Sequence, residues 1–534
     1  MHFSPAVNAS PKRWRTFGLT TLLVWILTAL WSQATPLMSV TDEPSHTIRA
    51  AAAARGQFIG EVGEFADVGR VEFSVPKGMA DAYELTCTAW QVFTPANCQP
   101  DVADSIEPLA TGTSSAGANL PTYYFLVGWP SLLAGGEAGM WLMRLWSAFL
   151  FSALVGIAAM QLGTLPRHRW ALTGLAVGAL PTAIYIGGSL NPNGLEWAGA
   201  AAVFSTLLAL GRDPSTSREL VERCTLVVVS AVLLVSARGI TPLWLLLALV
   251  AALLASHRDV LFSVVRRWQL WLAVAVAALS MGLSALWIMR PPDYDIAGLP
   301  SDGRGEPPIV GARLAWDRLA LHWEQLVNWY GWQDTEGPDF SRLVLLAILI
   351  SFALTGVAVG RGGLAIAAGV LVVAFVTTPI ALSAMLITDA GYIWLGRYML
   401  AVVPLITITT GVAIDDRGVG SSPIAERLRW SLLAAIGTVH FISYVYVLRR
   451  FAVGQDGSLI AMLSTPEWQP ALLTMPSTAL VGTVLATCVL LIGRARDASV
   501  TAGRGSPRLD RLVRWTRRWM RRPCCASMSG SVRS

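Results

Sequence analysis

The segment Ser39-Val40-Thr41-Asp42-Glu43-Pro44-Ser45-His46-Thr47-Ile48-Arg49 follows the first long apolar run of the chain, residues 17–36. An apolar run of about 20 residues is long enough to cross the hydrocarbon core of a bilayer as a helix. The acidic pair Asp42-Glu43 therefore stands where this helix leaves the lipid. Because ionisable side chains at a membrane boundary are costly and often functional, we take this pair as the candidate chemical centre.

The composition assigns the chain to the membrane proteins. Hydrophobic residues make up 54% of the 534 residues, charged residues only 14%, and the mean hydropathy is +0.53. These values exclude a water-soluble globular protein of ordinary composition. We predict an all-α, multi-pass membrane protein with a transmembrane region over residues 17–493. Its apolar runs predict about twelve transmembrane helices, at residues 17–36, 139–162, 170–190, 195–211, 223–238, 241–256, 269–289, 343–360, 364–388, 392–414, 430–448 and 474–493.

Basic residues in the short loops predict the orientation. The N-terminal segment 1–16 is basic, and arginines recur in alternate later loops, at 167–169, 212–223, 258–267 and 427–429. Such loops usually face the cytoplasm. The tail 494–534 carries eleven arginines against two aspartates, and an even number of spans places it on the same side. We predict a disordered basic tail held near anionic lipid rather than a nucleic-acid-binding segment, and an uncleaved first span.

Two segments on the outer face are too long to be turns. Residues 37–138 hold twelve acidic residues against four Arg or Lys, and residues 290–342 hold nine acidic residues against five arginines. Connections of this length are rarely without structure. We therefore predict a small folded extracytoplasmic cap with short juxtamembrane helices.

The cysteines fit this topology. Cys87 and Cys98 both lie in the first outer segment, where an oxidising compartment would permit a disulfide bond. Cys224 and Cys488 fall in predicted spans and are expected to be packing residues. In the basic tail, Cys524-Cys525 is expected to be unpaired or lipidated.

A short helix is predicted directly after the acidic pair, over residues 44–55, because a proline opens it, alanines fill it and a glycine follows it. On this helix His46 and Arg49 share one face, and Asp42 and Glu43 stand at the positive end of its dipole. This arrangement gathers an acid, an imidazole and a guanidinium. The alternative is that Asp42 or Glu43 only caps the helix and His46 faces interfacial water.

Five arginines stand at the outer ends of predicted spans, against the usual inward bias. Arg144 and Arg397 lie about five residues inside their helices, roughly 7 Å below the boundary. A buried cation needs an anion, and a lipid-linked phosphate or diphosphate could accept a bidentate hydrogen bond from arginine. Arg397 is expected to bind a ligand or an internal partner. For Arg238, Arg290 and Arg342 we favour contacts with phospholipid headgroups.

Three further outer-face motifs are less specific. Asn191-Pro192-Asn193-Gly194 is typical of a turn, with a functional role as the alternative. Pro121-Thr122-Tyr123-Tyr124 fits an aromatic anchor at the membrane interface. The loop Trp329-Tyr330-Gly331-Trp332-Gln333-Asp334 offers aromatic surface that suits a carbohydrate or a lipid surface equally.

Together, Asp42-Glu43 with His46, the segment 121–124, Asn191-Pro192-Asn193, the loop at Tyr330-Gly331-Trp332 and Gly396-Arg397-Tyr398 resemble the actinobacterial membrane proteins of domain-of-unknown-function family 2142 (DUF2142). The resemblance covers roughly residues 15–495. That family is itself similar to the GT-C glycosyltransferases, which use polyprenyl-phosphate sugars and keep an acidic motif in the first outer loop. The resemblance implies a GT-C-like fold with Asp42 or Glu43 as the catalytic carboxylate. It departs at Asn193, where an acidic residue would be expected.

From these features we predict a membrane glycosyltransferase that moves a sugar from a polyprenyl-phosphate donor to a glycan or glycolipid acceptor of the cell envelope, on the extracytoplasmic face. Asp42 or Glu43 acts as general base in a single inverting displacement. The predicted substrate-binding residues are His46, Arg49, Arg144, Asn191, Arg397 and Tyr398. A divalent metal shared by Asp42, Glu43 and His46 remains open.

Two other functions compete with this prediction. Many membrane spans also suit a transporter or flippase of a lipid-linked envelope precursor, and a scaffold for envelope assembly is a third class. The sequence has no convincing internal repeat, and its ionisable residues gather at one boundary beneath large outer loops. This distribution favours chemistry at the membrane surface over passage through the membrane.

Overall fold

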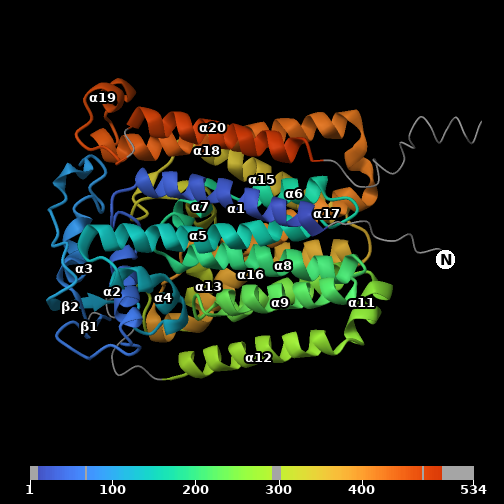
Figure 1. Ribbon diagram of the computed structural model, residues 1–534, viewed down its shortest axis with the longest axis horizontal. Helices are drawn as coiled ribbons and strands as arrows, with labels where there is room; N and C mark the ends of the chain where they lie inside the picture. The colour runs from blue at the N-terminus through green and yellow to red at the C-terminus, as the bar shows by residue number, and fades with distance from the viewer. Residues whose placement is uncertain (1–9, 67–68, 291–301, 472–473, 496–534) are drawn as a thin grey trace, which may run out of the picture.

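Long apolar helices lie side by side in one bundle, and a small folded cap covers one end of it (Figure 1). The computed structural model describes residues 10–66, 69–290, 302–471 and 474–495. Most of the predicted basic tail, with Cys524 and Cys525, and the first nine residues lie outside the described residues. In Figure 1 the cap is on the left and the helices run from left to right.

The bundle and its connecting turns contain fourteen α-helices among the described residues. In chain order they are α1 (Ser10–Gln33), α5 (Gly136–Leu162), α6 (Arg169–Gly178), α7 (Pro181–Gly187), α8 (Pro192–Arg212), α9 (Ser217–Val235), α10 (Thr241–Ala255), α11 (Arg258–Val265), α12 (Trp268–Ile288), α15 (Asp339–Val359), α16 (Gly363–Ala390), α17 (Val402–Arg417), α18 (Pro423–Val453) and α20 (Thr474–Gly493). Two 3-10 turns, η5 (Gly396–Met399) and η6 (Val419–Ser421), flank α17.

Eight of these helices are long and apolar enough to cross a membrane, counted over the described part of the chain: α1, α5, α8, α12, α15, α16, α18 and α20. A ninth span results if the bent pair α6 and α7 is counted as one. The protein is therefore a multi-pass helical membrane protein. The sequence-based count of about twelve is higher than these helices support by length and composition alone.

Helices coincide with all twelve predicted segments, but four of them are not single long apolar spans. The segment 170–190 breaks before Pro181, with a bend of 70° between α6 and α7, because proline cannot continue a helix and restricts the residue before it. The segment 392–414 is helical only from Val402, after the η5 turn. Helix α9 begins with charged residues, and α10 has only 15 residues.

Helix α8 lies at the centre of the bundle. Nearly all of its residues are buried, and it packs against α5, α9, α10 and α17. The small residues Gly199, Ala200, Ala201 and Ala202 allow these neighbours to approach closely. By contrast only two residues of α12, Ala273 and Ser284, are buried, and the helix lies on the outside of the bundle. The N-terminal turn of α8 is therefore buried at the end of the bundle that the cap covers.

The cap is built from both large outer segments. The first provides α2 (Glu43–Ala54), β1 (Val71–Pro76), α3 (Lys77–Ala80), η2 (Asp81–Thr86), η3 (Ala96–Cys98), β2 (Leu109–Ser114), α4 (Pro121–Gly128) and η4 (Trp129–Leu132). Strands β1 and β2 pair antiparallel, with Val71 opposite Ser114. The second provides α13 (Pro308–Asp317), α14 (Leu319–Asn328) and the short antiparallel pair β3 (Trp329–Tyr330) and β4 (Thr335–Glu336), and α19 (Leu459–Ser464) follows α18.

Two local predictions about the cap are confirmed. The helix expected over residues 44–55 is α2, shifted by one residue. Cys87 and Cys98 form a disulfide bond. Of the two cysteines predicted to pack inside spans, Cys224 is buried and Cys488 is partly buried.

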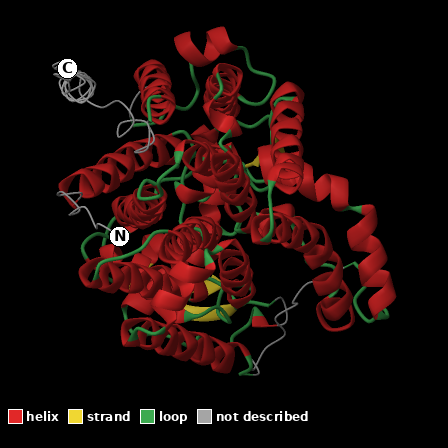
Figure 2. Ribbon diagram, turned by 90° about the vertical axis from the view of Figure 1, so that its right-hand side faces the viewer, coloured by secondary structure: helices red, strands yellow, loops and turns green. Residues whose placement is uncertain are grey.

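Ion pairs gather at the end of the bundle opposite the cap. This end faces the viewer in Figure 2. Helix α1 begins and α20 ends there. The pairs are Arg13 with Glu219 and Glu222, Arg169 and Arg429 with Glu426, Arg212 with Asp416, and Arg223 with Asp213. The short loops that the charge pattern assigned to one face of the membrane therefore do share one end of the molecule.

Candidate functional site

Asp42 directly precedes α2 and has a left-handed backbone, with φ 65°. Aspartate tolerates this conformation better than most residues, but it still costs free energy. Its carboxylate makes no capping hydrogen bond to α2; it forms an ion pair with Arg397 of the η5 turn. The Asp42 side chain keeps 41% of its surface exposed, whereas Arg397 is buried. Asp42 therefore has a carboxylate that another molecule could reach.

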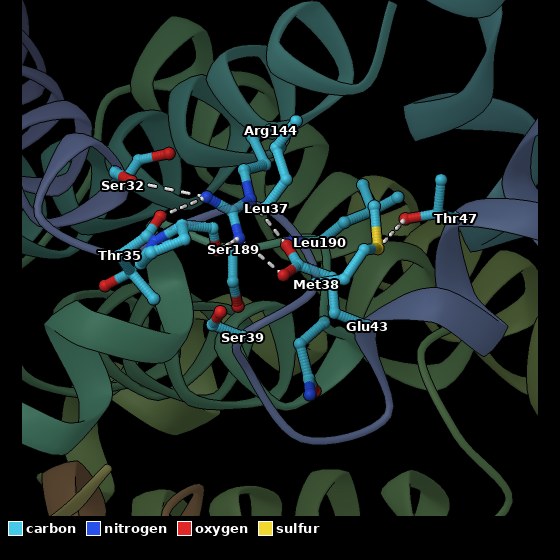
Figure 3. Close-up of polar contacts among 12 residues, drawn as sticks. Ser32, Thr35, Leu37, Met38, Ser39, Glu43, Thr47, Arg144, Ser189 and Leu190 are labelled. Carbon is cyan, nitrogen blue, oxygen red and sulfur yellow. Dashed lines mark hydrogen bonds and ion pairs between the residues drawn. The ribbon is translucent and has the colours of Figure 1, made fainter. Parts of the chain in front are cut away.

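The neighbouring carboxylate of Glu43 is completely buried. Arg144 of α5 donates two hydrogen bonds to it, from Nε at 2.6 Å and from Nη2 at 2.5 Å. The backbone N–H of Leu190 donates a third, at 3.1 Å. Figure 3 shows the Arg144 guanidinium between Glu43 and the carbonyl oxygens of Ser32 and Thr35, which are 3.3 Å and 2.7 Å from Nη1.

The two acids of the pair thus have different surroundings. Glu43 and Arg144 satisfy each other inside the protein and tie α2 to the end of α1 and to α5. A buried, fully paired carboxylate is an unfavourable position for exchanging protons with a substrate. The geometry favours Asp42 over Glu43 as the reactive group, and it gives Arg144 a structural partner in place of the predicted phosphate.

His46 and Arg49 are also held by internal contacts. The Nδ1 atom of His46 lies 2.9 Å from the Tyr124 hydroxyl, and the two rings stack. Burial lowers the pKa of His46 to about 3, so its imidazole is neutral at neutral pH. Arg49 donates to the carbonyl oxygens of Gln57 and Phe58, at 3.0 Å and 2.7 Å. Both side chains hold α2 against the neighbouring parts of the cap, and neither lines the cavity next to Asp42.

A cavity opens beside Asp42, at the junction of the cap and the bundle. Its empty space is about 270 Å³ when the open mouth is included, but the enclosed part is only about 10 Å³, room for about one water molecule. Its lining residues come from five parts of the chain: Val40, Thr41, Thr182, Tyr185, Ile186, Asn191, Gln325, Trp329, Gly331, Gln333 and Arg397. Asn191, a predicted substrate-binding residue, is among them, although its Nδ2 also donates to the Thr41 carbonyl oxygen at 3.1 Å.

Three of the lining residues carry a buried polar atom that has no hydrogen-bond partner within the described residues. These atoms are Thr182 Oγ1, Trp329 Nε1 and Arg397 Nε. Buried polar groups are almost always paired, and an exception asks for an explanation such as a ligand or an ordered water. Two of the three are obligate donors, which suits an acceptor-rich ligand such as a phosphate or a sugar.

Arg238 extends the positive side of the site. It lies between α9 and α10, and its guanidinium lies over the Tyr398 ring, 4.2 Å from the ring centroid. Arg397 lies 5.6 Å from the same centroid. Nη1 of Arg238 is buried and has no partner in the part of the chain that the structure describes. The interpretation of Arg238 as a headgroup contact is therefore wrong, because its guanidinium turns inward.

The other two outer arginines have different partners. Arg342 forms ion pairs with three acids of the second outer segment, Glu324, Glu336 and Asp339. Arg290 lies over the ring of Trp287, 5.5 Å from its centroid. Acidic side chains therefore take the place that we had assigned to phospholipid phosphates at Arg342.

Glu196 is a site residue that the sequence reasoning missed. It lies one turn into α8, is 1% exposed, and accepts a hydrogen bond of 2.6 Å from Nδ2 of Asn193. Its Oε1 has no partner among the described residues, and its charge interacts with Arg238 and Arg397. The signal was available, because Glu196 is a lone acid in the apolar run 195–211. Its carboxyl group lies within hydrogen-bond distance of Asn193, the position where an acidic residue had been expected.

The comparison with known protein families agrees with the fold. The family described as "Predicted membrane protein (DUF2142)" matches residues 25–406. The chain belongs to the DUF2142 family. No curated protein matches it. The DUF2142 match includes Asp42, Glu196, Arg238 and Arg397, and it ends within α17, before α18 and α20.

Two carboxyl groups of this DUF2142 site, Asp42 and Glu196, lie near two guanidinium groups, Arg238 and Arg397. The protein around the partly exposed Asp42 carboxyl displaces some of its water, which would raise its pKa, but Arg397 and the other nearby positive charges outweigh this effect and hold the pKa below its ordinary value. The Asp42 carboxylate is therefore ionised at neutral pH.

The three residues considered for a metal do not converge. Asp42 pairs with Arg397, Glu43 with Arg144, and His46 with Tyr124. Across the described residues, no group of three or more His, Cys, Asp or Glu side chains is arranged to hold a metal ion. The arrangement instead combines an accessible carboxylate with Arg397, which lines a polar cavity, and with Arg238 on the same Tyr398 ring, which suits general-base chemistry on an anionic substrate.

Proposed function

We propose that this protein is a membrane glycosyltransferase that transfers a sugar from a polyprenyl-phosphate donor to a glycan or glycolipid of the cell envelope. In this proposal the chain crosses the membrane twelve times in a GT-C-like arrangement, both termini are cytoplasmic, and the cap lies outside. The observation that carries the proposal is the accessible carboxylate of Asp42 paired with Arg397 at the edge of the cavity.

The donor phosphate would bind to the two arginines. Arg397 and Arg238 flank the Tyr398 ring and keep unpartnered N–H groups, so they can offer charge-assisted hydrogen bonds to phosphate oxygens. Arg144, which the sequence suggested for this role, is committed to Glu43. The enclosed part of the cavity, about 10 Å³, has room for no more than about one water molecule, well below the range of about 300–1,000 Å³ typical of small-molecule sites. In this proposal the sugar-phosphate head therefore occupies the open mouth of the cavity, while the polyprenyl chain stays in the lipid.

Asp42 would act as the general base. The acceptor oxygen forms a bond to the anomeric carbon, the bond from that carbon to the phosphate oxygen breaks, and the acceptor proton moves to Asp42. The arginines stabilise the charge of the departing phosphate. A single displacement inverts the anomeric centre. Because the ion pair with Arg397 weakens Asp42 as a base, a phosphate that binds Arg397 would restore its basicity.

The Asp42→Asn variant tests this function. Purified protein in nanodiscs is incubated with a panel of polyprenyl-phosphate sugars and envelope glycan acceptors, and transfer is measured by mass spectrometry. Removing a general base should lower the transfer rate by about 10²–10⁴-fold. Asp101→Asn is the matched control, because Asp101 is an exposed aspartate of the same cap. Equal transfer by Asp42→Asn and the wild-type protein would exclude Asp42 as the base.

A transporter or flippase of a lipid-linked precursor is the second candidate, and one observation favours it. The broken pair α6 and α7 places Thr182, Tyr185 and Ile186 at the cavity, and broken helices are common at transporter binding sites. In proteoliposomes a flippase would move a fluorescent polyprenyl phosphate between leaflets without any acceptor. This activity would be expected to persist when no sugar is transferred.

A further inference from the structure

The disulfide loop 87–98 presents an exposed tryptophan in an unfavourable backbone conformation. Trp90 has φ 56° and is 68% exposed. A bulky residue in the left-handed region costs free energy, as does an exposed indole. The left-handed backbone and the exposed indole both make the folded state less stable. Stability therefore does not explain why Trp90 is exposed at this position. Strained residues of this kind tend to cluster at ligand sites.

Contacts on all sides hold the Trp90 backbone in place. The Cys87–Cys98 disulfide closes the loop. The buried guanidinium of Arg450 donates to the carbonyl oxygens of Thr88, Gln91 and Thr94, at 2.9 Å, 3.0 Å and 2.8 Å. The Trp90 N–H donates to Asp334 Oδ2 at 2.7 Å. The backbone that carries the exposed indole is therefore held in place.

The indole of Trp332 packs beside that of Trp90, and the residues on either side of Trp332 line the cavity. The rings of Trp90 and Trp332 lie 5.3 Å apart between centroids, with an angle of 57° between their planes. Trp332 donates from Nε1 to the Met38 carbonyl oxygen at 3.0 Å. Its neighbours in sequence, Gly331 and Gln333, line the cavity. The Gly331 carbonyl oxygen also accepts from the backbone N–H of Thr41, next to Asp42, at 3.2 Å.

All four residues with a positive φ other than glycine, counted over the described residues, lie in these segments: Met38, Asp42, Trp90 and Gln333. The strained backbone positions are thus at Asp42, the candidate general base, at Trp90 of the Trp90–Trp332 pair, and in the segments around Met38 and Gln333. Gln333 follows Trp332 in sequence, and the Met38 carbonyl oxygen accepts a hydrogen bond from Trp332 Nε1, so two of these positions adjoin the Trp90–Trp332 pair. We call the Trp90–Trp332 pair the two-tryptophan corner.

The chemistry of the corner suits a neutral carbohydrate. The C–H face of a sugar ring is weakly positive and packs against the negative face of an aromatic ring, while its hydroxyl groups need polar neighbours such as the Gln333 amide. An anionic lipid surface fits less well. The two outer segments hold twelve acidic residues against four basic ones and nine against five, which repels anionic headgroups.

We propose that Trp90 and Trp332 form a binding subsite for a neutral glycan acceptor, which leads the acceptor hydroxyl toward Asp42. The acceptor role rests on the proposed glycosyltransferase function, whereas the carbohydrate binding does not. Trp90 is a binding residue in this inference and takes no part in the chemical step.

Residue-resolved footprinting tests the subsite on the intact protein. The full chain in nanodiscs is oxidised with hydroxyl radicals, alone and with mannotriose, maltotriose, cellotriose or galactotriose, and the oxidation of each residue is read by mass spectrometry. At least one trisaccharide should lower the oxidation of Trp90 several-fold. Phe93 is the internal control, because it is 65% exposed on the same loop and should be unaffected.

Substitutions of Trp90 test whether its indole binds the trisaccharide that protects it from oxidation. By calorimetry, Trp90→Ala should weaken trisaccharide binding about tenfold, in line with the worth of one aromatic contact. Trp90→Phe should keep part of the binding, and Phe93→Ala should keep all of it. Failure of every trisaccharide to protect Trp90 would overturn the inference, as would equal loss in Phe93→Ala. So would a Trp90 that resists oxidation in nanodiscs before any sugar is added, because lipid would then cover it.

Footprinting and the transfer assay on the same wild-type preparation separate the two proposals. Protection of Trp90 without any sugar transfer by the wild-type protein would support the subsite and contradict the glycosyltransferase. Sugar transfer that proceeds with no protection of Trp90 would support the glycosyltransferase and contradict the subsite.

Discussion

Adjacent residues in this protein carry out different tasks. Asp42 and Glu43 are neighbours in sequence, but Asp42 has a left-handed backbone outside α2 whereas Glu43 is the first residue of the helix, so their side chains point in different directions. Glu43 turns inward to Arg144, and Asp42 turns to Arg397 at the cavity. The same holds for the arginines, of which Arg144 stabilises the fold while Arg397 and Arg238 remain able to bind an anion.

Glu43→Gln should destabilise the protein by about 3–5 kcal/mol, because it leaves the buried charge of Arg144 without its counterion. Thermal unfolding in detergent measures the change. Glu64→Gln, at an exposed position of the same cap, should have almost no effect. A Glu43→Gln protein that is fully stable but inactive would instead assign Glu43 to the chemistry.

Because His46 is buried in its neutral form, we expect the folded protein to lose stability in mild acid. Burial keeps its pKa at about 3 in the folded protein, against 6.5 for an ordinary histidine. Between these two values the unfolded chain binds a proton that folded His46 does not, so stability falls as the pH is lowered, by at most about 1.4 kcal/mol per pH unit. His46→Gln keeps a partner for Tyr124 and should show a shallower decline between pH 7 and pH 4. An unchanged decline would mean that His46 does not contribute.

At the scale of elements, α2 sets the position of Asp42. Its alanines Ala50 to Ala53 are completely buried, so the helix packs closely on its neighbours. Gly128, at the end of α4, makes this packing possible. A Cβ atom at position 128 would lie 1.9 Å from the Ala50 carbonyl oxygen, which is far inside contact distance.

Gly128→Ala should therefore displace α2 and lower both the melting temperature and the activity. Overpacking of this kind typically costs about 1–3 kcal/mol. Gly18→Ala in α1 is the matched control, because a Cβ atom there meets nothing within 4 Å. Alanine within a helix is favoured over glycine, so the control should be neutral or slightly stabilising. Similar destabilisation in both variants would argue against close packing of α2 on α4.

At the scale of the whole molecule, the two ends of the bundle differ in character. One end holds the acidic cap, the disulfide bond and the cavity, and the other is joined by ion pairs of the short basic loops. This polarity matches the distribution of basic residues that orients membrane proteins.

Cysteine labelling of intact cells should resolve the orientation. In a background that lacks the tail cysteines, Ser105→Cys in the cap should react with a membrane-impermeant maleimide. Ser217→Cys, exposed at the start of α9, should react only after the membrane is permeabilised. The reverse pattern would place the candidate site on the cytoplasmic side and would contradict transfer at the extracytoplasmic face.

Several features were predictable because they depend on local sequence. The apolar runs predicted the helices, the proline and alanines after Glu43 predicted α2, and the two cysteines of the cap predicted the disulfide. The break before Pro181 was also encoded locally but was overlooked. Glu196 was missed because it was read as part of an apolar run rather than as a charge inside one.

The sequence by itself therefore determined the class of the protein, its helical segments and the residues that carry charge, since hydrophobicity and helix boundaries are properties of short stretches of chain. Only the tertiary structure decided which charge meets which. Asp42 and Arg397 are 355 residues apart, and Glu43 and Arg144 are 101 apart. Such pairs form only when α1, α5, α8 and η5 pack at the same end of the bundle, and burial then decides which carboxylate remains accessible.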